Sequence, residues 1–249
     1  MGDIINKSMM ALITIPSIIL FLLPIAIMII IIVTYSIYQR KTYIKTEYFA
    51  ATKTPYGSMR RNSGLYGEYL TYKKIARLDG NKRFLFNCYT PKDDGTTSEV
   101  DVILLHSSGI YVFESKNYSG WIFGTETQKM WTQTFPNGRK EKFYNPVMQN
   151  STHIKWLMSA LPDIDKNAFH SIIVFSERCE LKKINLSTTN HIVIKRNCLL
   201  RSFVDKIESE VLSDHTIESI YQKLYPFTQA SDVVKIAHIN KITEEHNNE

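Results

Sequence analysis

Two neighbouring stretches decide the fold: Ser98-Glu-Val-Asp-Val-Ile-Leu-Leu-His106 and Gly109-Ile-Tyr-Val-Phe-Glu-Ser-Lys116. Both are rich in β-branched and aromatic residues, a composition typical of strands. Ser107-Ser108-Gly109 supplies turn chemistry between them. The two stretches therefore predict a pair of antiparallel strands joined by a tight turn.

Charged side chains interrupt the apolar rows of these strands. Because side chains alternate between the two faces, Glu114 and Lys116 continue the row of Val112, and Asp101 continues the row of Ile103. The same alternation assigns the opposite face of the Asp101 strand to Val100, Val102 and Leu104. An unpaired buried carboxylate costs several kcal/mol, so these positions need a partner or a function.

The flanking sequence supplies the other elements of an α–β–β–β–α–β order. The predicted helices are Leu65–Leu78, a helix from Asn145-Pro146 to Pro162, and two segments within Leu199–Phe227 that split near Ser213-Asp214; the predicted strands are Arg83–Thr90, Ser171–Ser176 and His191–Lys195. Residues 118–144 are interpreted as a β-excursion or loop because of their glycines and proline. This order predicts an α/β (α+β) fold, a mixed sheet with helices on both sides.

The N-terminal segment is typical of a membrane anchor. From Met9 to Val33, 21 of 25 residues are apolar, and no charge occurs between Ser8 and Gln39. A bilayer-spanning helix needs about 20 apolar residues, whereas a cleaved signal peptide has an apolar region of about 7–15 followed by small residues. We therefore expect one transmembrane helix and its flank at 9–38, a linker at 39–63, a mixed-sheet domain at 64–176 and a C-terminal strand with helices at 177–249.

Charge and cysteine content narrow the compartment and the partners. Residues 1–60 hold 6 basic and 2 acidic side chains of the chain's 30 and 24, which leaves 24 and 22 for the remainder, or +2. A near-neutral globular part does not by itself indicate nucleic-acid binding. The basic residues Arg40, Lys41 and Lys45 after the span predict a cytoplasmic C-terminal domain, and three widely spaced cysteines fit a reducing compartment.

The set of inward carboxylates fits a divalent-metal site. Glu68 lies in helical register with Leu65 and Tyr72, so it also lies on a packed face. One lysine cannot neutralise three carboxylates, and the excess negative charge favours Mg²⁺ or Mn²⁺. The simpler alternative is an ion pair of Lys116 with Glu114 or Asp101 at a strand end.

These residues also carry a family resemblance. The chain resembles the nuclease-related domain (NERD), a branch of the PD-(D/E)xK nuclease superfamily with a restriction-endonuclease-like fold. The matching blocks, in order, are Gly64-Leu-Tyr-Gly-Glu68, Glu99-Val-Asp-Val-Ile-Leu-Leu105, Gly109-Ile-Tyr-Val-Phe-Glu-Ser-Lys-Asn117, Gly120-Trp-Ile-Phe-Gly124 with Trp131, and Asn145-Pro-Val-Met-Gln149. Val102 departs from the pattern, since many relatives carry histidine there.

The resemblance implies a role for each matched residue. Glu68 corresponds to the first-helix acid, Asp101 to the metal-binding aspartate, Glu114 and Lys116 to the ExK pair, and Gln149 to the polar residue of the second helix. The backbone carbonyl of Ser115 would complete the metal shell of Asp101 and Glu114. Gln149, His153 and Trp156 share one helical stripe, although a polar stripe needs no cause beyond solvation.

Two functional hypotheses follow. The first is a membrane-anchored, cytoplasm-facing, Mg²⁺- or Mn²⁺-dependent phosphodiesterase acting on nucleic acid, with DNA favoured over RNA. The second is a non-catalytic module of the same fold that binds nucleic acid or protein at the membrane. The sequence shows no zinc-protease, P-loop or serine-hydrolase motif. It does not distinguish endonuclease from exonuclease action.

Overall fold

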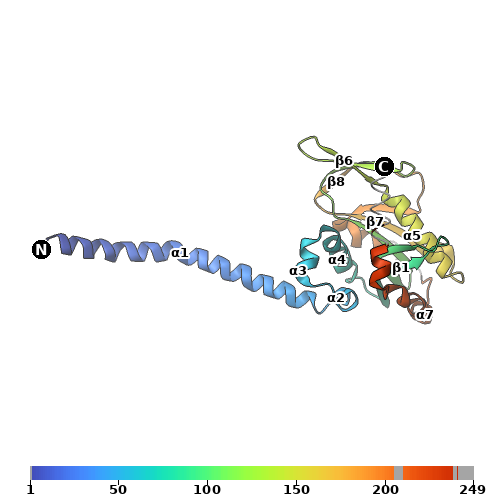
Figure 1. Cartoon of the computed structure of the whole chain (residues 1–249), viewed down its shortest axis with the longest axis horizontal. Helices are drawn as coiled ribbons and strands as arrows, with labels where there is room; N and C mark the ends of the chain where they lie inside the picture. The colour runs from blue at the N-terminus through green and yellow to red at the C-terminus, as the bar shows by residue number, and fades with distance from the viewer. Residues whose placement is uncertain (1, 205–209, 238–239, 241–249) are drawn as a thin grey trace. The chain divides into compact units, whose positions relative to one another are not determined.

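The computed structural model describes residues 2–204, 210–237 and 240, and the side chains of these except residues 2–21, 203 and 204. The chain divides into two compact units, residues 1–50 and 51–249 (Figure 1). The start of the predicted span and the polar tail at 244–249 lie outside the described side chains.

The first unit is dominated by helix α1 (Gly2–Tyr43). Its segment Leu22–Tyr43 is long and apolar enough to cross a bilayer. At 1.5 Å per residue these 22 residues extend about 33 Å, against a hydrocarbon thickness of about 30 Å. Arg40 and Lys41 lie in the last turn of the helix, as expected for cations near a helix C-terminus.

The segment predicted as a linker contains two short helices, α2 (Glu47–Thr52) and α3 (Tyr56–Arg61). Thr46 begins α2, because its hydroxyl accepts a hydrogen bond from the backbone N–H of Phe49 at 3.2 Å. Pro55 occupies the N-cap position of α3. The segment is therefore partly helical, and Pro55 marks the start of a helix and not an unstructured linker.

The second unit is built on a five-stranded mixed sheet in the order β1-β2-β3-β7-β9. The strands are β1 (Lys82–Pro91), β2 (Thr97–His106), β3 (Gly109–Lys116), β7 (Phe169–Phe175) and β9 (His191–Lys195). The first three form an antiparallel meander, and β3, β7 and β9 run parallel. The predicted fold class, a mixed α/β sheet flanked by helices, is confirmed.

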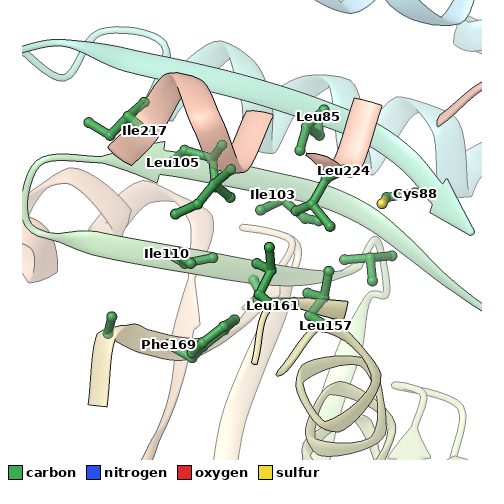
Figure 2. Close-up of a cluster of buried hydrophobic side chains, with 14 of the residues drawn as sticks. Leu85, Cys88, Ile103, Leu105, Ile110, Leu157, Leu161, Phe169, Ile217 and Leu224 are labelled. Atoms are coloured by element: carbon green, nitrogen blue, oxygen red, sulfur yellow. The ribbon is translucent and has the colours of Figure 1, made fainter. Parts of the chain in front are cut away.

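Helices cover both faces of this sheet. Helix α4 (Ser63–Ile75) packs on one face, where Tyr72 makes edge-on ring contacts with Phe84 and Phe86 of β1. Helices α5 (Pro146–Ala160) and α7 (Asp214–Leu224) pack on the other. Figure 2 shows the resulting core. Its labelled side chains are Leu85, Cys88, Ile103, Leu105, Ile110, Leu157, Leu161, Phe169, Ile217 and Leu224.

Alternation breaks down at one point in the meander, and this corrects one expectation. Val100 belongs to the core with Ile103, although strict alternation assigns it to the opposite face. The β1–β2 ladder pairs Phe86 with Val102 and Cys88 with Val100. Asn87 therefore lies opposite Asp101, and its φ of 50° is left-handed. This local reversal of β1 brings Cys88 and Val100 to the core face and places Asp101 at the irregularity.

Residues 118–144 form three strands of a second sheet, which the sequence indicated only as an excursion or loop. The sheet has the order β6-β5-β4-β8. Its strands are β4 (Gly120–Thr125), β5 (Met130–Thr134), β6 (Lys140–Tyr144) and β8 (Cys179–Asn185). Gly124 is required here, because a Cβ would lie 2.3 Å from the Trp131 ring. Strand β8 was not predicted, since its charged residues have low strand propensity.

The remaining short elements lie between α5 and β7, directly after β9 and after α7. They are α6 (Leu199–Val204) and three 3₁₀ turns, η1 (Lys166–Ala168), η2 (Arg196–Cys198) and η3 (Tyr225–Thr228). Ser213 caps α7 by accepting a hydrogen bond from the N–H of Thr216, so the predicted split between the two C-terminal helices is confirmed. The second sheet lies beside the end of the central sheet at which β3 and β7 finish (Figure 1).

Candidate metal and phosphodiester site

The centre of the candidate site is an ion pair at the end of β3. Glu114 is buried, and its Oε1 lies 2.7 Å from Nζ of Lys116. Both side chains lie on the α5 side of the sheet, because they follow Val112 along the strand. The structure therefore contains the Lys116–Glu114 ion pair that the simpler alternative predicted.

Helix α5 places two polar side chains over this pair. Nζ of Lys116 donates to Oε1 of Gln149 at 3.0 Å. Nε2 of His153 lies 3.3 Å from Oε2 of Glu114, and Nδ1 of His153 lies 2.7 Å from the hydroxyl of Ser98. His153 is one helical turn beyond Gln149, so one face of α5 contacts both members of the pair.

The position of α5 is fixed by buried amide hydrogen bonds. Asn145 caps the helix, and its amide nitrogen donates to the backbone carbonyls of Thr125, Glu126 and Gln128. Asn150 donates to the carbonyl of Val112 at 2.9 Å. Because Val112 is two residues before Glu114, this bond fixes the helix directly against the strand that carries the site.

Helix α4 approaches the other face of β3 closely at its end. A Cβ on Gly67 would lie 2.9 Å from Cβ of Asn117, so only glycine permits this distance. The hydroxyls of Thr71 and Ser115 are 3.0 Å apart. The Ser115 side chain therefore faces α4, and only its backbone carbonyl is a candidate ligand. Glu68 follows Gly67 and is half-buried at this junction.

Electrostatic interactions connect Asp101 and Glu68 to the ion pair. Desolvation raises the pKa of Asp101 well above its usual range, and repulsion from Glu114 and Glu68 raises it further. The charge of Lys116 offsets part of this increase. The structure thus brings together Glu68, Asp101, Glu114, Lys116 and Gln149, with more negative charge than one lysine neutralises.

The ion pair shifts the titration of both of its members. Burial by itself raises the pKa of Glu114, but Lys116 and the neighbouring His153 lower it to about 2. Burial by itself lowers the pKa of Lys116, but the Glu114 carboxylate raises it overall. Near neutral pH both Glu114 and Lys116 are therefore ionised, whereas the raised pKa of Asp101 favours its protonated form.

The donor set fits a hard divalent cation that keeps several waters. Oε2 of Glu114 is buried and forms no well-aligned hydrogen bond, although Nε2 of His153 lies 3.3 Å from it, so this oxygen still has an acceptor position for a ligand. Among the described side chains, no group of three or more His, Cys, Asp or Glu residues could hold a metal ion. The oxygen donors of Asp101 and Glu114 are of the kind that Mg²⁺ binds together with several waters.

Two further groups at the site received little or no weight in the sequence analysis. His153 was assigned to a polar helix face, but it is buried between Ser98 and Glu114. Tyr89 donates to Oε1 of Glu99 at 2.6 Å, and its pKa is raised by burial, by Glu99 and by Asp101. The position of His153, four residues after Gln149, was the available signal for the histidine, whereas no pattern in the sequence indicated Tyr89.

A mixed sheet that carries acidic residues and a lysine at the end of its meander, with polar side chains from a covering helix, defines a nuclease-like fold. The family model described as "nuclease-related domain" (NERD) matches residues 63–176. An uncharacterized protein of Bacillus anthracis, pXO1-01, is 32% identical over 166 residues, which is 65% of this chain and 74% of the relative. The chain belongs to the nuclease-related domain family, as the resemblance implied.

Among solved structures, the chain is similar to Can2 from Sulfobacillus thermosulfidooxidans, determined in complex with cyclic tetra-adenylate. The identity is 16% and the TM-score 0.34. The match covers 59% of this chain but 36% of Can2, so this chain spans only about a third of that protein. A similarity of this size gives no information on ligands or activity.

Proposed function

We propose that this protein is a membrane-anchored, cytoplasm-facing, divalent-metal-dependent phosphodiesterase that cleaves nucleic acid, with DNA favoured over RNA. The observation that carries the proposal is the surplus of carboxylates near Lys116: Asp101 interacts with both members of the Glu114–Lys116 pair and also with Glu68. A structural ion pair needs one acid, whereas this site collects three.

The chain's own groups supply positioning and charge. Asp101, Oε2 of Glu114 and the carbonyl of Ser115 would hold Mg²⁺ or Mn²⁺, which lowers the pKa of a bound water and offsets charge on the phosphate. Lys116 is held by Glu114 and Gln149 at 2.7 and 3.0 Å. An ammonium has three donors, so one N–H is left to orient the attacking water or stabilise the phosphate oxygens.

The direct experiment is a cleavage assay on the full chain in neutral-lipid nanodiscs. Single- and double-stranded DNA and RNA are each incubated with Mg²⁺, Mn²⁺, Ca²⁺ or EDTA. We expect cleavage with Mg²⁺ or Mn²⁺ and none with EDTA. Absence of cleavage of all four substrates with every metal would exclude the enzymatic proposal.

One observation favours a second candidate, a non-catalytic binding module of the same fold. Lys116 contacts Glu114 and Gln149, which suffices for a structural role, and the chain beyond residue 60 has a net charge of only +2. In that case the charged residues of the site stabilise the fold or contact a bound partner; they are Glu68, Asp101, Glu114 and Lys116. The cleavage assay separates the two candidates, because only the enzyme turns over substrate.

Membrane topology is a separate expectation. Arg40 and Lys41 end the apolar helix and Lys45 follows it, and by the positive-inside rule these cations favour a cytoplasmic position for the second unit. A green fluorescent protein fused after Glu249 should fluoresce, and alkaline phosphatase at the same point should be inactive. The reverse pattern would show that the second unit lies outside the cytoplasm, and the cytoplasm-facing part of the proposal would then be wrong.

His153 should act as a positioning residue for Glu114. Its ring lies between Ser98 and Glu114, and loss of such an outer contact typically costs 10- to 100-fold in metal affinity or activity. We expect His153→Ala to lower the Mg²⁺ affinity by about 10- to 100-fold, and His153→Gln to lower it less. Thermal shifts over a Mg²⁺ titration measure this. Equal Mg²⁺ dependence in wild type and His153→Ala would show that the histidine only fills space.

A further inference from the structure

The outer face of the second sheet combines aromatic and basic side chains. Pairing of Trp121 with Thr134 and of Phe123 with Thr132 places these side chains on one face of the sheet. The opposite face packs into a core through Ile122, Trp131 and Phe143. The sheet therefore has one apolar inner face and one outer face that contacts solvent.

Lysines flank the aromatic residues on both edge strands. Thr134 pairs with Lys140 and Thr132 with Lys142 on β6, while Phe123 pairs with Lys183 on β8. The register shift in β8 brings Nζ of Lys182 to 5.8 Å from the centre of the Trp121 ring. The Phe123 row thus contains Lys142, Thr132, the ring and Lys183, whereas the Trp121 row runs from Lys140 through Thr134 to Glu180, with Lys182 beside the ring.

This outer face carries a positive surplus. Glu180 is the acid that pairs with Trp121 across the strands, and it is bound to Lys182 at 2.5 Å. Within the described part of the chain, Lys140, Lys142 and Lys183 form no ion pair. Arg139 and Glu141 pair with each other at 3.0 Å beside this face. Three lysines are thus left to interact with an anionic partner.

Protection of sheet edges explains the lysines but not the tryptophan. Edge strands commonly carry lysine to prevent pairing with other chains, and β6 and β8 are the edges here. Trp121 lies on the inner strand β4, yet it is 40% exposed. A large ring exposed between two lysine-bearing edges is the arrangement by which proteins stack bases and neutralise phosphates.

We propose that this face, formed by Trp121, Phe123, Lys140, Lys142, Lys182 and Lys183, binds single-stranded nucleic acid. It spans three inter-strand distances, about 14 Å, which matches about four bases at the 3.4 Å stacking distance. A duplex does not present base faces to a ring, so the exposed tryptophan favours a single strand. The outer face bears no exposed leucine, isoleucine or valine among its described residues, which argues against insertion into a lipid bilayer.

The second sheet is attached to the elements of the candidate cleavage site. Its inner face packs on Phe175 of β7 and Val147 of α5, and Trp131 stacks on Phe175 with an interplanar angle of 3°. Phe175 pairs with Lys116 in the parallel ladder. The inference rests on the proposed function only for the class of ligand, because this face needs no metal.

The test measures binding without cleavage. The full chain in neutral-lipid nanodiscs is titrated into a fluorescein-labelled single-stranded oligonucleotide of about twelve nucleotides in EDTA, and anisotropy is recorded at several salt concentrations. Trp121→Ala should weaken binding roughly 5- to 150-fold, the equivalent of losing one stacked base. Trp121→Phe, which keeps a ring, should bind more tightly than Trp121→Ala.

The contribution of the lysines is measured by the salt dependence of binding, with a matched control variant. The double variant Lys140→Ala/Lys142→Ala should reduce the slope of log affinity against log salt by about 1.4, at about 0.7 per phosphate contact on a single strand. Lys155→Ala/Lys166→Ala removes two other exposed lysines of the same domain and should leave the slope unchanged. Melting temperatures identify any variant that fails to fold.

Three results would overturn the proposal. They are a wild type that binds no single strand in EDTA, a Trp121→Ala variant that binds as tightly as wild type, and a duplex that competes as well as a single strand. A fourth concerns lipid: anionic vesicles that displace the oligonucleotide and depend on Trp121 would identify a membrane-contacting face. Because cleavage is measured separately with Mg²⁺, an inactive site with intact EDTA binding refutes only the phosphodiesterase proposal.

Discussion

Asp101→Asn should abolish cleavage and at the same time stabilise the metal-free protein at neutral pH. The amide removes a proposed metal ligand, and it also removes a carboxylate that Glu114 and Glu68 repel. A purely structural aspartate would give the opposite sign, since loss of a stabilising charge lowers the free energy of unfolding. The combination of lost activity with gained stability is therefore specific to a functional site.

The raised pKa of Asp101 also determines how the stability of the metal-free protein changes with pH. The pKa of Asp101 is raised in the folded protein, so above the unfolded value of about 3.9 the folded state binds the extra proton. Stability conferred by the protonated side chain is thus complete below that value and is lost as pH rises through the folded pKa. The decline should be present in metal-free wild type and absent in Asp101→Asn.

Thermal melts between pH 4 and 8, with EDTA or with Mg²⁺, measure both effects. Mg²⁺ at 100 times its dissociation constant stabilises a single-site protein by about 2.7 kcal/mol, and Asp101→Asn should lose most of this. Asp93→Asn is the matched control, because Asp93 is an exposed aspartate in the turn after β1. An Asp101→Asn variant with the same pH slope and the same Mg²⁺ shift as wild type would show that the site has been misassigned.

The central sheet could be predicted because its residues follow simple periodic rules. Apolar rows with period two define β2 and β3 between Thr97 and Lys116, and Asn145 before Pro146 marks the start of α5. Glu114, Lys116 and Gln149 meet because these elements pack directly on one another. A strand, its covering helix and the polar residues on their shared face are thus accessible from local sequence.

Features that depend on tertiary contacts were not accessible in this way. The glycines of 118–144 lowered the strand signal, yet Gly124 is there to accommodate the Trp131 ring. The reversal at Asn87 moved Val100 to the core face, and no local pattern announces a left-handed residue within a strand. His153 gains its role only through Ser98 and Glu114, which lie far from it in sequence.

Lys116→Met should lower kcat by about 10²-fold or more, the scale of losing one preorganised group that stabilises developing charge. The change removes the ammonium and keeps the apolar stem. Nucleic-acid affinity in Ca²⁺, which is expected to fill the site without supporting cleavage, should change little. Rates are measured on the folded fraction, so that lost stability is not counted as lost catalysis.

The structure also predicts a stability cost for this variant, because it leaves Glu114 buried without its ion-pair partner. Breaking a buried pair costs about 3–5 kcal/mol. The pKa of Glu114 is lowered to about 2 in the folded protein, so the pair stabilises fully above the unfolded value of about 4.3. This contribution is lost as pH falls toward 2, and the stability difference between wild type and Lys116→Met should disappear over that range.

A second substitution separates the structural role of Lys116 from the catalytic one. Gln149→Leu removes the other partner of the ammonium, at 3.0 Å, without leaving an unpaired buried charge. It should therefore reduce kcat while costing much less stability than Lys116→Met. If kcat of both variants instead follows the folded fraction alone, Lys116 only neutralises Glu114. If wild type turns over nothing and Lys116→Met weakens nucleic-acid binding, the domain is a binding module.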